Sequence, residues 1–172
     1  LHKNFNDEIT HLLNERQRKK NFRPAFKYDT KDIREGTWEV AKIPDEILDR
    51  RVEITGPPDR KMIINAFNLG ANIYMCDFED TNCPMYENVI QGQINIHDAV
   101  TGTIEYTNPK NGKKYRLGDK TSGLFVRPRG LHLLEKNYFV DRKPIRASLF
   151  DYGLYVFHNY KNLLKKGSRP YF

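Results

Sequence analysis

The sequence is poor in cysteine, and it lacks both long apolar runs and the glycine-rich motifs of nucleotide-binding proteins. Its two cysteines, Cys76 and Cys83, are too far apart for a CxxC metal or redox motif, so we expect reduced thiols in a cytoplasmic protein. No apolar run is long enough to cross a bilayer, and the first residues lack the apolar segment of a signal peptide. Without GxGxxG or GxxxxGK[ST], neither a dinucleotide site nor a phosphate-binding loop is predicted.

Lysine and arginine outnumber the acidic residues, and the net charge is +7. A basic surface can serve nucleic acid or another polyanion. No nucleic-acid-binding signature accompanies these charges, so we expect no nucleic-acid partner. Solvated helix ends account for most of them, and a phosphorylated cofactor is the polyanion that such a surface would suit. The basic residues cluster in two places, at 16–23 and at 161–169.

The first fifty residues predict one helix followed by an irregular connector. Apolar residues recur at helical spacing between Leu1 and Leu13, which favours an amphipathic helix over about 2–20. Residues 21–50 contain scattered turn signals and no regular period. Within this connector, Trp38 is interpreted as a packing anchor.

From position 51 onward, strands and helices alternate, which is typical of consecutive βα units in an α/β fold. Asp59 is a good N-cap for the first helix, and Gly70 provides its C-terminal stop. An excursion at 103–117 reads as a β-hairpin because it contains an Asn-Gly turn. The other expected elements are strands at 52–55, 71–76 and 123–127, helices at about 87–100 and 149–165, and the start of a further strand at 170–172.

Two short polar motifs stand at the ends of predicted strands. Asp77 and Glu79 follow one apolar run, and Arg127 and Arg129 follow another. If the strands continue, alternation puts the two acids on one face and the two arginines on one face. Charges at the end of a buried strand are costly unless they serve a partner. Because α/β proteins build active sites at the carboxyl ends of parallel strands, we predict an enzyme core.

Five blocks of sequence follow one another along nearly the whole chain: RRVEITGP (50–57), MCDFED (75–80), GQIN (92–95), VRPRGLH (126–132) and SLFDYGLY (148–155). Together these blocks resemble malate synthase, and most closely its shorter A-type members. The resemblance implies a partial TIM (β/α)8 barrel preceded by an N-terminal helical clasp. The clasp and connector would occupy residues 1–50, and the first βα units would occupy 51–172. Three and a fraction such units cannot close a barrel, so the chain is expected to be a piece of a larger protein.

By this resemblance, the parent enzyme condenses acetyl-CoA with glyoxylate and hydrolyses the product to malate and CoA in the glyoxylate cycle, using Mg²⁺. Arg127 matches the family's catalytic arginine, and a permanently charged, bidentate guanidinium suits an enolate and a carboxylate. Asp77 and Glu79 match residues that line the same site, with Glu79 reaching the metal through water. The structural alternative for these residues is an ion pair that only fixes barrel register.

Asp80 and Thr81 complete the candidate set. Asp80 is expected to line the site or cap the following loop, and Thr81 stands where relatives carry a serine near acetyl-CoA. Arg129 is interpreted as structural support. His132 is interpreted as a hydrogen-bonded loop histidine.

The resemblance also implies what the chain does not contain. The family's direct Mg²⁺ ligands and its catalytic aspartate base would lie beyond residue 172, so we expect the isolated chain to need the rest of the barrel and a C-terminal domain for activity. A barrel lyase for citryl- or malyl-CoA is an alternative, and so is a non-catalytic interaction fragment. A peroxisomal or glyoxysomal location is the alternative to a cytoplasmic one.

Overall fold

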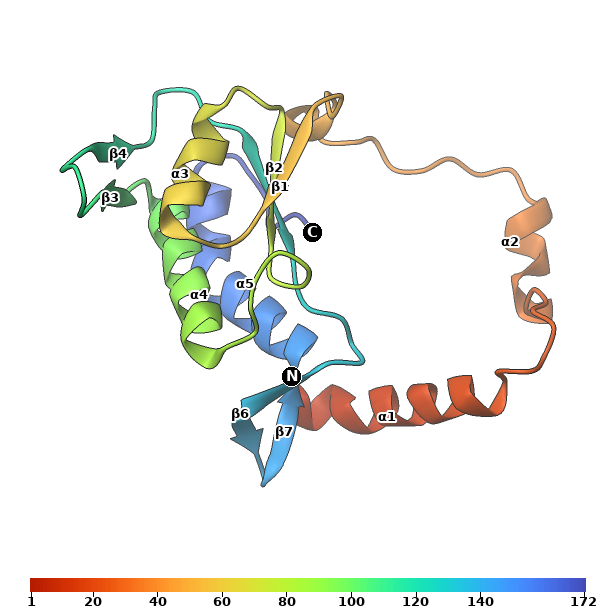
Figure 1. Ribbon diagram of the computed structural model, residues 1–172. Helices are drawn as coiled ribbons and strands as arrows, with labels where there is room; N and C mark the ends of the chain where they lie inside the picture. Colours follow the sequence, from red (N-terminus) through yellow and green to blue (C-terminus); the bar gives the residue numbers. More distant parts are fainter.

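A three-stranded parallel sheet forms the centre of the computed structural model, which describes residues 1–172 (Figure 1). Its strands are β1 (Glu53–Gly56), β2 (Ile73–Asp77) and β5 (Gly123–Arg127), in the spatial order β1-β2-β5. Tyr171 adds an isolated parallel bridge to Phe125, which confirms the expected start of a further strand. Consecutive parallel strands in sequence order are the arrangement of the first units of a β/α barrel, as the sequence predicted.

Helices α3 (Arg60–Asn68), α4 (Tyr86–Thr101) and α5 (Ala147–Lys165) cover one face of this sheet (Figure 1). The Asp59 side chain accepts a hydrogen bond from the Met62 N–H at 2.9 Å and so caps α3, as predicted. In chain order α3 follows β1 and α4 follows β2, while a hairpin separates α5 from β5, so the chain repeats a strand–helix unit three times. The α/β class and the consecutive βα units are therefore confirmed.

The apolar core lies between the sheet and the three helices. Side chains of Tyr74, Cys76 and Val126 point into this layer and are fully or almost fully buried. Alternation puts their neighbours Asp77 and Arg127 on the opposite face, the one that a closed barrel would turn inward. The side-chain period of the strands thus separates the packing layer from the polar residues.

Gly92 in α4 marks a close approach between this helix and the residues that follow β1 and β2. A Cβ at this position would lie 2.8 Å from Pro58 side-chain carbons and 2.9 Å from the Phe78 ring. The neighbouring Asn95 donates through Nδ2 to the Pro58 carbonyl at 2.9 Å. Gly92 and Asn95, in the 92–95 block, therefore pack α4 against the loop after β1.

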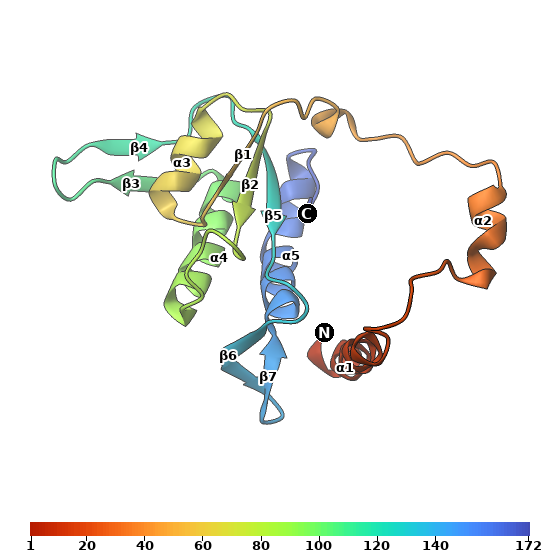
Figure 2. The same cartoon turned by 45° about the vertical axis from the view of Figure 1, so that its right-hand side comes forward.

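Two hairpins leave the βα repeat. The first pairs β3 (Glu105–Thr107) with β4 (Lys114–Arg116) and projects beyond α3 (Figure 2), which confirms the predicted excursion. The second pairs β6 (Leu134–Val140) with β7 (Lys143–Arg146) and was not predicted. Its turn residues, Asp141 and Arg142, both have positive φ without being glycine, so the usual turn signal is missing.

The N-terminal region begins with α1 (His2–Arg18), which confirms the predicted helix and contacts β7. Residues 19–44 then arch away from the sheet, with short helical turns at η1 (Tyr28–Thr30) and α2 (Lys31–Glu35), and the chain returns to the sheet at η2 (Asp45–Ile47) in both views (Figures 1 and 2). Trp38 is 63% exposed, and its indole N–H donates only to the Ile33 carbonyl at 2.9 Å. The prediction that Trp38 anchors packing is wrong within this chain, since most of this residue is exposed. No helix has the length and apolarity to span a membrane.

We expect Gly92→Ala to destabilise the folded protein by about 1–3 kcal/mol, because the new methyl group overlaps Pro58 and Phe78. The measurement is thermal denaturation of the full-length protein. Gly118→Ala is the matched control, since its Cβ would meet only the Asn68 amide oxygen, at an ordinary 3.5 Å. Equal denaturation temperatures for both variants would contradict the close approach of α4.

The two cysteines should differ sharply in reactivity. Burial raises the pKa of the Cys76 thiol to about 12, whereas Cys83 is exposed. Iodoacetamide at neutral pH should therefore alkylate Cys83 in the native protein and reach Cys76 only after denaturation, as judged by peptide mass spectrometry. Rapid native alkylation of Cys76 would show that β2 is not packed as described.

Candidate functional site

The candidate site lies where β2 and β5 end. Parallel pairing places Asp77 opposite Arg127, and the Phe78 N–H donates to the Arg127 carbonyl at 3.0 Å. The two polar motifs therefore meet at the carboxyl end of the sheet, as predicted. This register brings acidic and basic side chains together although fifty positions separate them in the sequence.

Three carboxylates surround the Arg127 guanidinium. Its Nη2 lies 2.7 Å from Glu79 Oε2, and its Nη1 lies 2.7 Å from Asp80 Oδ2 and 3.8 Å from Asp77 Oδ2. The Arg127 side chain is still 43% exposed, so one side of the guanidinium faces solvent. The arginine is therefore held in a defined position while it remains accessible to an anion.

Asp77 is the buried member of this cluster, at 1% exposure. Its Oδ1 accepts from the backbone N–H groups of Glu79 (2.8 Å) and Asp80 (3.2 Å), which fixes the turn after β2. Its Oδ2 has no hydrogen-bond partner and faces Arg127. A buried carboxylate oxygen that only an arginine balances is costly, so the arginine and Asp77 depend on each other.

Glu79 and Thr81 are fixed by backbone groups. Glu79 Oε1 accepts from the Gly130 N–H at 3.0 Å, so this carboxylate bridges Arg127 and the loop after β5. Thr81 Oγ1 donates to the Asp77 carbonyl at 3.0 Å. The structure thus brings Asp77, Glu79 and Asp80 to Arg127, while Thr81 closes the same turn at its exposed edge.

Desolvation and the neighbouring negative charges have opposite effects on the pKa of Arg127. Partial desolvation lowers the pKa of the guanidinium, but the negative charges of Asp80, Asp77 and Glu79 outweigh this effect and raise the pKa overall. Three carboxylates against one guanidinium leave a local excess of two negative charges. Arg127 therefore stays protonated at every accessible pH.

Arg129 does not share a face with Arg127, so that prediction is wrong. Strand β5 ends at Arg127, and the chain then turns so that Arg129 points into the protein at 4% exposure. Its guanidinium reaches Asp151 Oδ1 (2.8 Å, from Nη2), Asp151 Oδ2 (2.9 Å, from Nε) and Glu135 Oε2 (2.9 Å, from Nη1). Its interpretation as structural support agrees with this placement.

Sequence reasoning missed Glu135 and Asp151 as partners of Arg129. Both are buried, at 1% and 0% exposure. Asp151 lies within the 148–155 block that carries the family resemblance, but no local pattern marks it as an arginine partner. His132 was expected to be hydrogen-bonded, but its ring makes no side-chain hydrogen bond and lies beside Gly130.

The carboxylates of the candidate site do not form a metal centre by themselves. No group of three or more His, Cys, Asp or Glu side chains is arranged to hold a metal ion. Glu79 and Asp80 instead direct their oxygens to Arg127. The residues of this chain therefore do not fit direct metal coordination.

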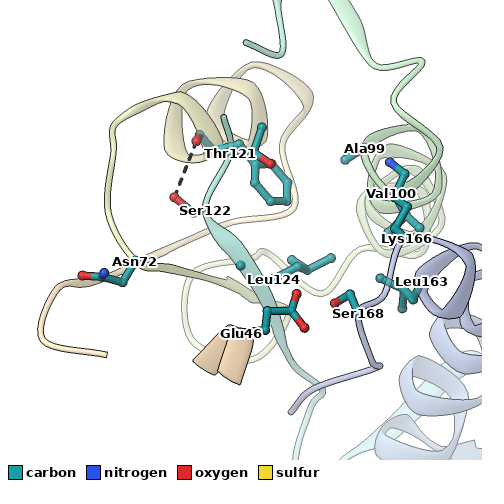
Figure 3. A pocket seen from close by; sticks show the side chains of 12 residues that line it. Glu46, Asn72, Ala99, Val100, Thr121, Ser122, Leu124, Leu163, Lys166 and Ser168 are labelled. Carbon is teal, nitrogen blue, oxygen red and sulfur yellow. Dashed lines mark hydrogen bonds between the residues drawn. The ribbon is translucent and has the colours of Figure 1, made fainter. Parts of the chain in front are cut away.

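A separate cavity of about 370 Å³ opens at the opposite end of the sheet (Figure 3). Asn72 and Ser122 line it just before β2 and β5 begin, together with Glu46, Lys166 and Ser168. Barrel enzymes carry their chemistry at the carboxyl ends of the strands, so this cavity is not the candidate active site.

The chain is similar to known proteins along its whole length. A family model described as malate synthase, TIM barrel domain, matches residues 123–172. The malate synthase of Myxococcus xanthus is 52% identical, with 100% of this chain and 32% of the relative covered. The bifunctional glyoxylate cycle protein of Caenorhabditis elegans is 53% identical over 87% of this chain and 16% of its own length. The glyoxysomal malate synthase of Cucurbita maxima is 51% identical over 87% of this chain and 27% of its own length. The chain thus spans about a third, or less, of the length of these relatives.

We expect Asp77→Asn to destabilise the full-length protein by about 1–3 kcal/mol, since the amide can present N–H groups to Arg127 or to buried backbone donors. Asp80→Asn is the matched control because its side chain is 64% exposed. Thermal denaturation of the two variants measures the difference. A larger effect at Asp80 than at Asp77 would contradict the buried role of Asp77.

Proposed function

Since the chain belongs to the malate synthase family, we propose that the full-length protein condenses acetyl-CoA with glyoxylate and hydrolyses the product to malate and CoA, in the glyoxylate cycle. One observation carries this proposal: a half-exposed arginine, held by three carboxylates, stands at the carboxyl ends of two parallel strands. The relatives named above are two malate synthases and one bifunctional glyoxylate cycle protein, and these names favour this reaction over acyl-CoA lyase activity.

The condensation needs a cation at two places. Loss of a methyl proton from acetyl-CoA gives an enolate oxygen, and attack on the glyoxylate aldehyde gives an alkoxide. A fixed guanidinium stabilises such charges at no reorganisation cost, because it is oriented before the substrate arrives. Arg127 meets this need since its position is set by Glu79 and by the backbone pairing with Asp77.

The partners of Arg127 would respond differently to a substrate anion. Asp80 is mostly exposed and contacts the guanidinium only through Nη1, so an incoming carboxylate or enolate displaces it readily. Glu79 is 19% exposed and is held by Gly130, so it stays in place. Asp77 remains as the buried counter-charge. Arg127 therefore exchanges one exposed partner for the substrate without losing its orientation.

The proposed reaction also requires groups from outside this chain. By family resemblance we propose Mg²⁺ as the cofactor, with its direct ligands and the catalytic aspartate base in the remainder of the protein. Mg²⁺ would supply electrophilic polarisation of the aldehyde when bound. Glu79 would face that ion through water, and Thr81 would border the acetyl-CoA site. We propose a cytoplasmic location, with a glyoxysomal one as the alternative that the named plant relative supports.

Arg127→Lys should lower glyoxylate-dependent release of CoA thiol from acetyl-CoA by at least about 100-fold, because an ammonium cannot form the two-nitrogen contact. The assay uses the purified full-length protein with Mg²⁺ and a thiol reagent.

Arg116→Lys is the matched control, since Arg116 is 63% exposed on the β3–β4 hairpin and pairs only with Glu105 at 3.4 Å. This variant should keep wild-type activity. Absence of CoA release from the folded wild-type protein would refute the proposed function, and full activity of Arg127→Lys would refute the role of Arg127.

A further inference from the structure

The last residue of β5 and the loop that follows it carry two arginines with opposite environments. Arg127 is half-exposed among the site carboxylates, whereas Arg129 is buried with Glu135 and Asp151. We define Arg129, Glu135 and Asp151 as the buried triad. It joins this loop to α5 through Asp151 and to the β6–β7 hairpin through Glu135.

The hydrogen-bonding groups of the buried triad are closely matched. Asp151 Oδ2 accepts from both the side chain and the backbone N–H of Arg129, at 2.9 and 3.0 Å. Glu135 Oε1 accepts from the backbone N–H (2.9 Å) and the side-chain amide (3.1 Å) of Asn137. Buried ion pairs of this kind rarely add net stability compared with apolar residues of similar volume. The triad therefore calls for an explanation other than stability.

Consecutive backbone N–H groups connect the buried triad to the candidate site. The Arg129 N–H donates to Asp151, and the next N–H, that of Gly130, donates to Glu79 Oε1 at 3.0 Å. Glu79 in turn contacts Arg127 at 2.7 Å through its other oxygen. A movement of Arg129 would therefore reach Arg127 through one peptide unit and one carboxylate.

The loop backbone at Gly130 lies directly against Glu79. A Cβ there would lie 2.8 Å from Glu79 Oε1 and 2.7 Å from the His132 ring, so no larger residue fits without a shift of these side chains. A displacement of the loop at Gly130 would therefore act directly on Glu79, which contacts Arg127.

We propose that the buried triad is a positioning unit for the reaction: it fixes the Gly130 N–H, which orients Glu79, which orients Arg127. Arg129, Glu135 and Asp151 touch no substrate, and they act through Glu79. This inference rests on the proposed function for its kinetic consequence, but the positional claim can be measured separately.

The test uses Arg129→Lys and Glu135→Gln in the full-length protein. Each should lower kcat by about 10- to 100-fold, as loss of groups that orient catalytic residues does, with KM for acetyl-CoA changed less than about twofold. Hydrogen exchange of a peptide containing Gly130, followed by mass spectrometry, should become faster in both variants.

Arg60→Lys is the matched control for a purely structural arginine. Arg60 also joins several elements, bonding Asp98 Oδ2 (2.6 Å), Asn95 Oδ1 (3.0 Å) and the Glu105 carbonyl (2.7 Å), but it contacts no residue of the site. It should lower the denaturation temperature without changing kcat or Gly130 exchange. A kcat and a Gly130 exchange rate in both triad variants that match those of Arg60→Lys would overturn the proposal.

Two further outcomes are also decisive. If Arg129→Lys does not fold, Glu135→Gln decides by the same criteria, because glutamine retains the shape and one acceptor. If the folded wild-type protein releases no CoA, the proposed function fails, and the exchange data alone decide the positioning claim. Faster exchange at Gly130 then supports that claim, and unchanged exchange refutes it.

Discussion

The register between β2 and β5 is the constraint on which the site depends. It sets Asp77 opposite Arg127 and ends both strands at the same level. The register is enforced from the other face, because Cys76 and Val126 must enter the packed layer against the helices. A slip of one residue would turn Asp77 or Arg127 into that apolar layer, at the cost of burying a charge. Packing on one face of the sheet therefore decides the chemistry on the other.

Arg127 at the end of β5 and Arg129 just after it meet different demands of the site. A residue that meets a substrate has to be accessible, and an accessible long side chain is mobile unless something holds it. Arg127 keeps its accessibility, while its carboxylate neighbours restrict it. Arg129 gives up accessibility and anchors the loop backbone to α5 and to the β6–β7 hairpin. In this way the β6–β7 hairpin, which lies outside the βα repeat, is linked by the Arg129–Glu135 ion pair to the carboxyl end of the sheet.

Much of this arrangement could be predicted from sequence, because local signals agree with the fold. Asp59 caps α3, Asn111-Gly112 marks the first hairpin, and charges at the ends of apolar runs locate the site. The wrong predictions concern features that depend on tertiary structure rather than on local sequence. Alternation was extended past Arg127, although the strand ends there and Arg129 turns inward. The β6–β7 hairpin escaped prediction because Asp141 and Arg142 adopt positive φ without glycine. Trp38 illustrates a different limit, since this large apolar residue stays mostly exposed within this chain.

The most direct measurement is a crystal structure of the full-length protein with glyoxylate bound. The account predicts that glyoxylate oxygens lie within hydrogen-bond distance of the Arg127 guanidinium, that Asp80 has moved away, and that Glu79 still accepts from the Gly130 N–H. Glyoxylate bound elsewhere, with the contact between Arg127 and Asp80 intact, would contradict the account.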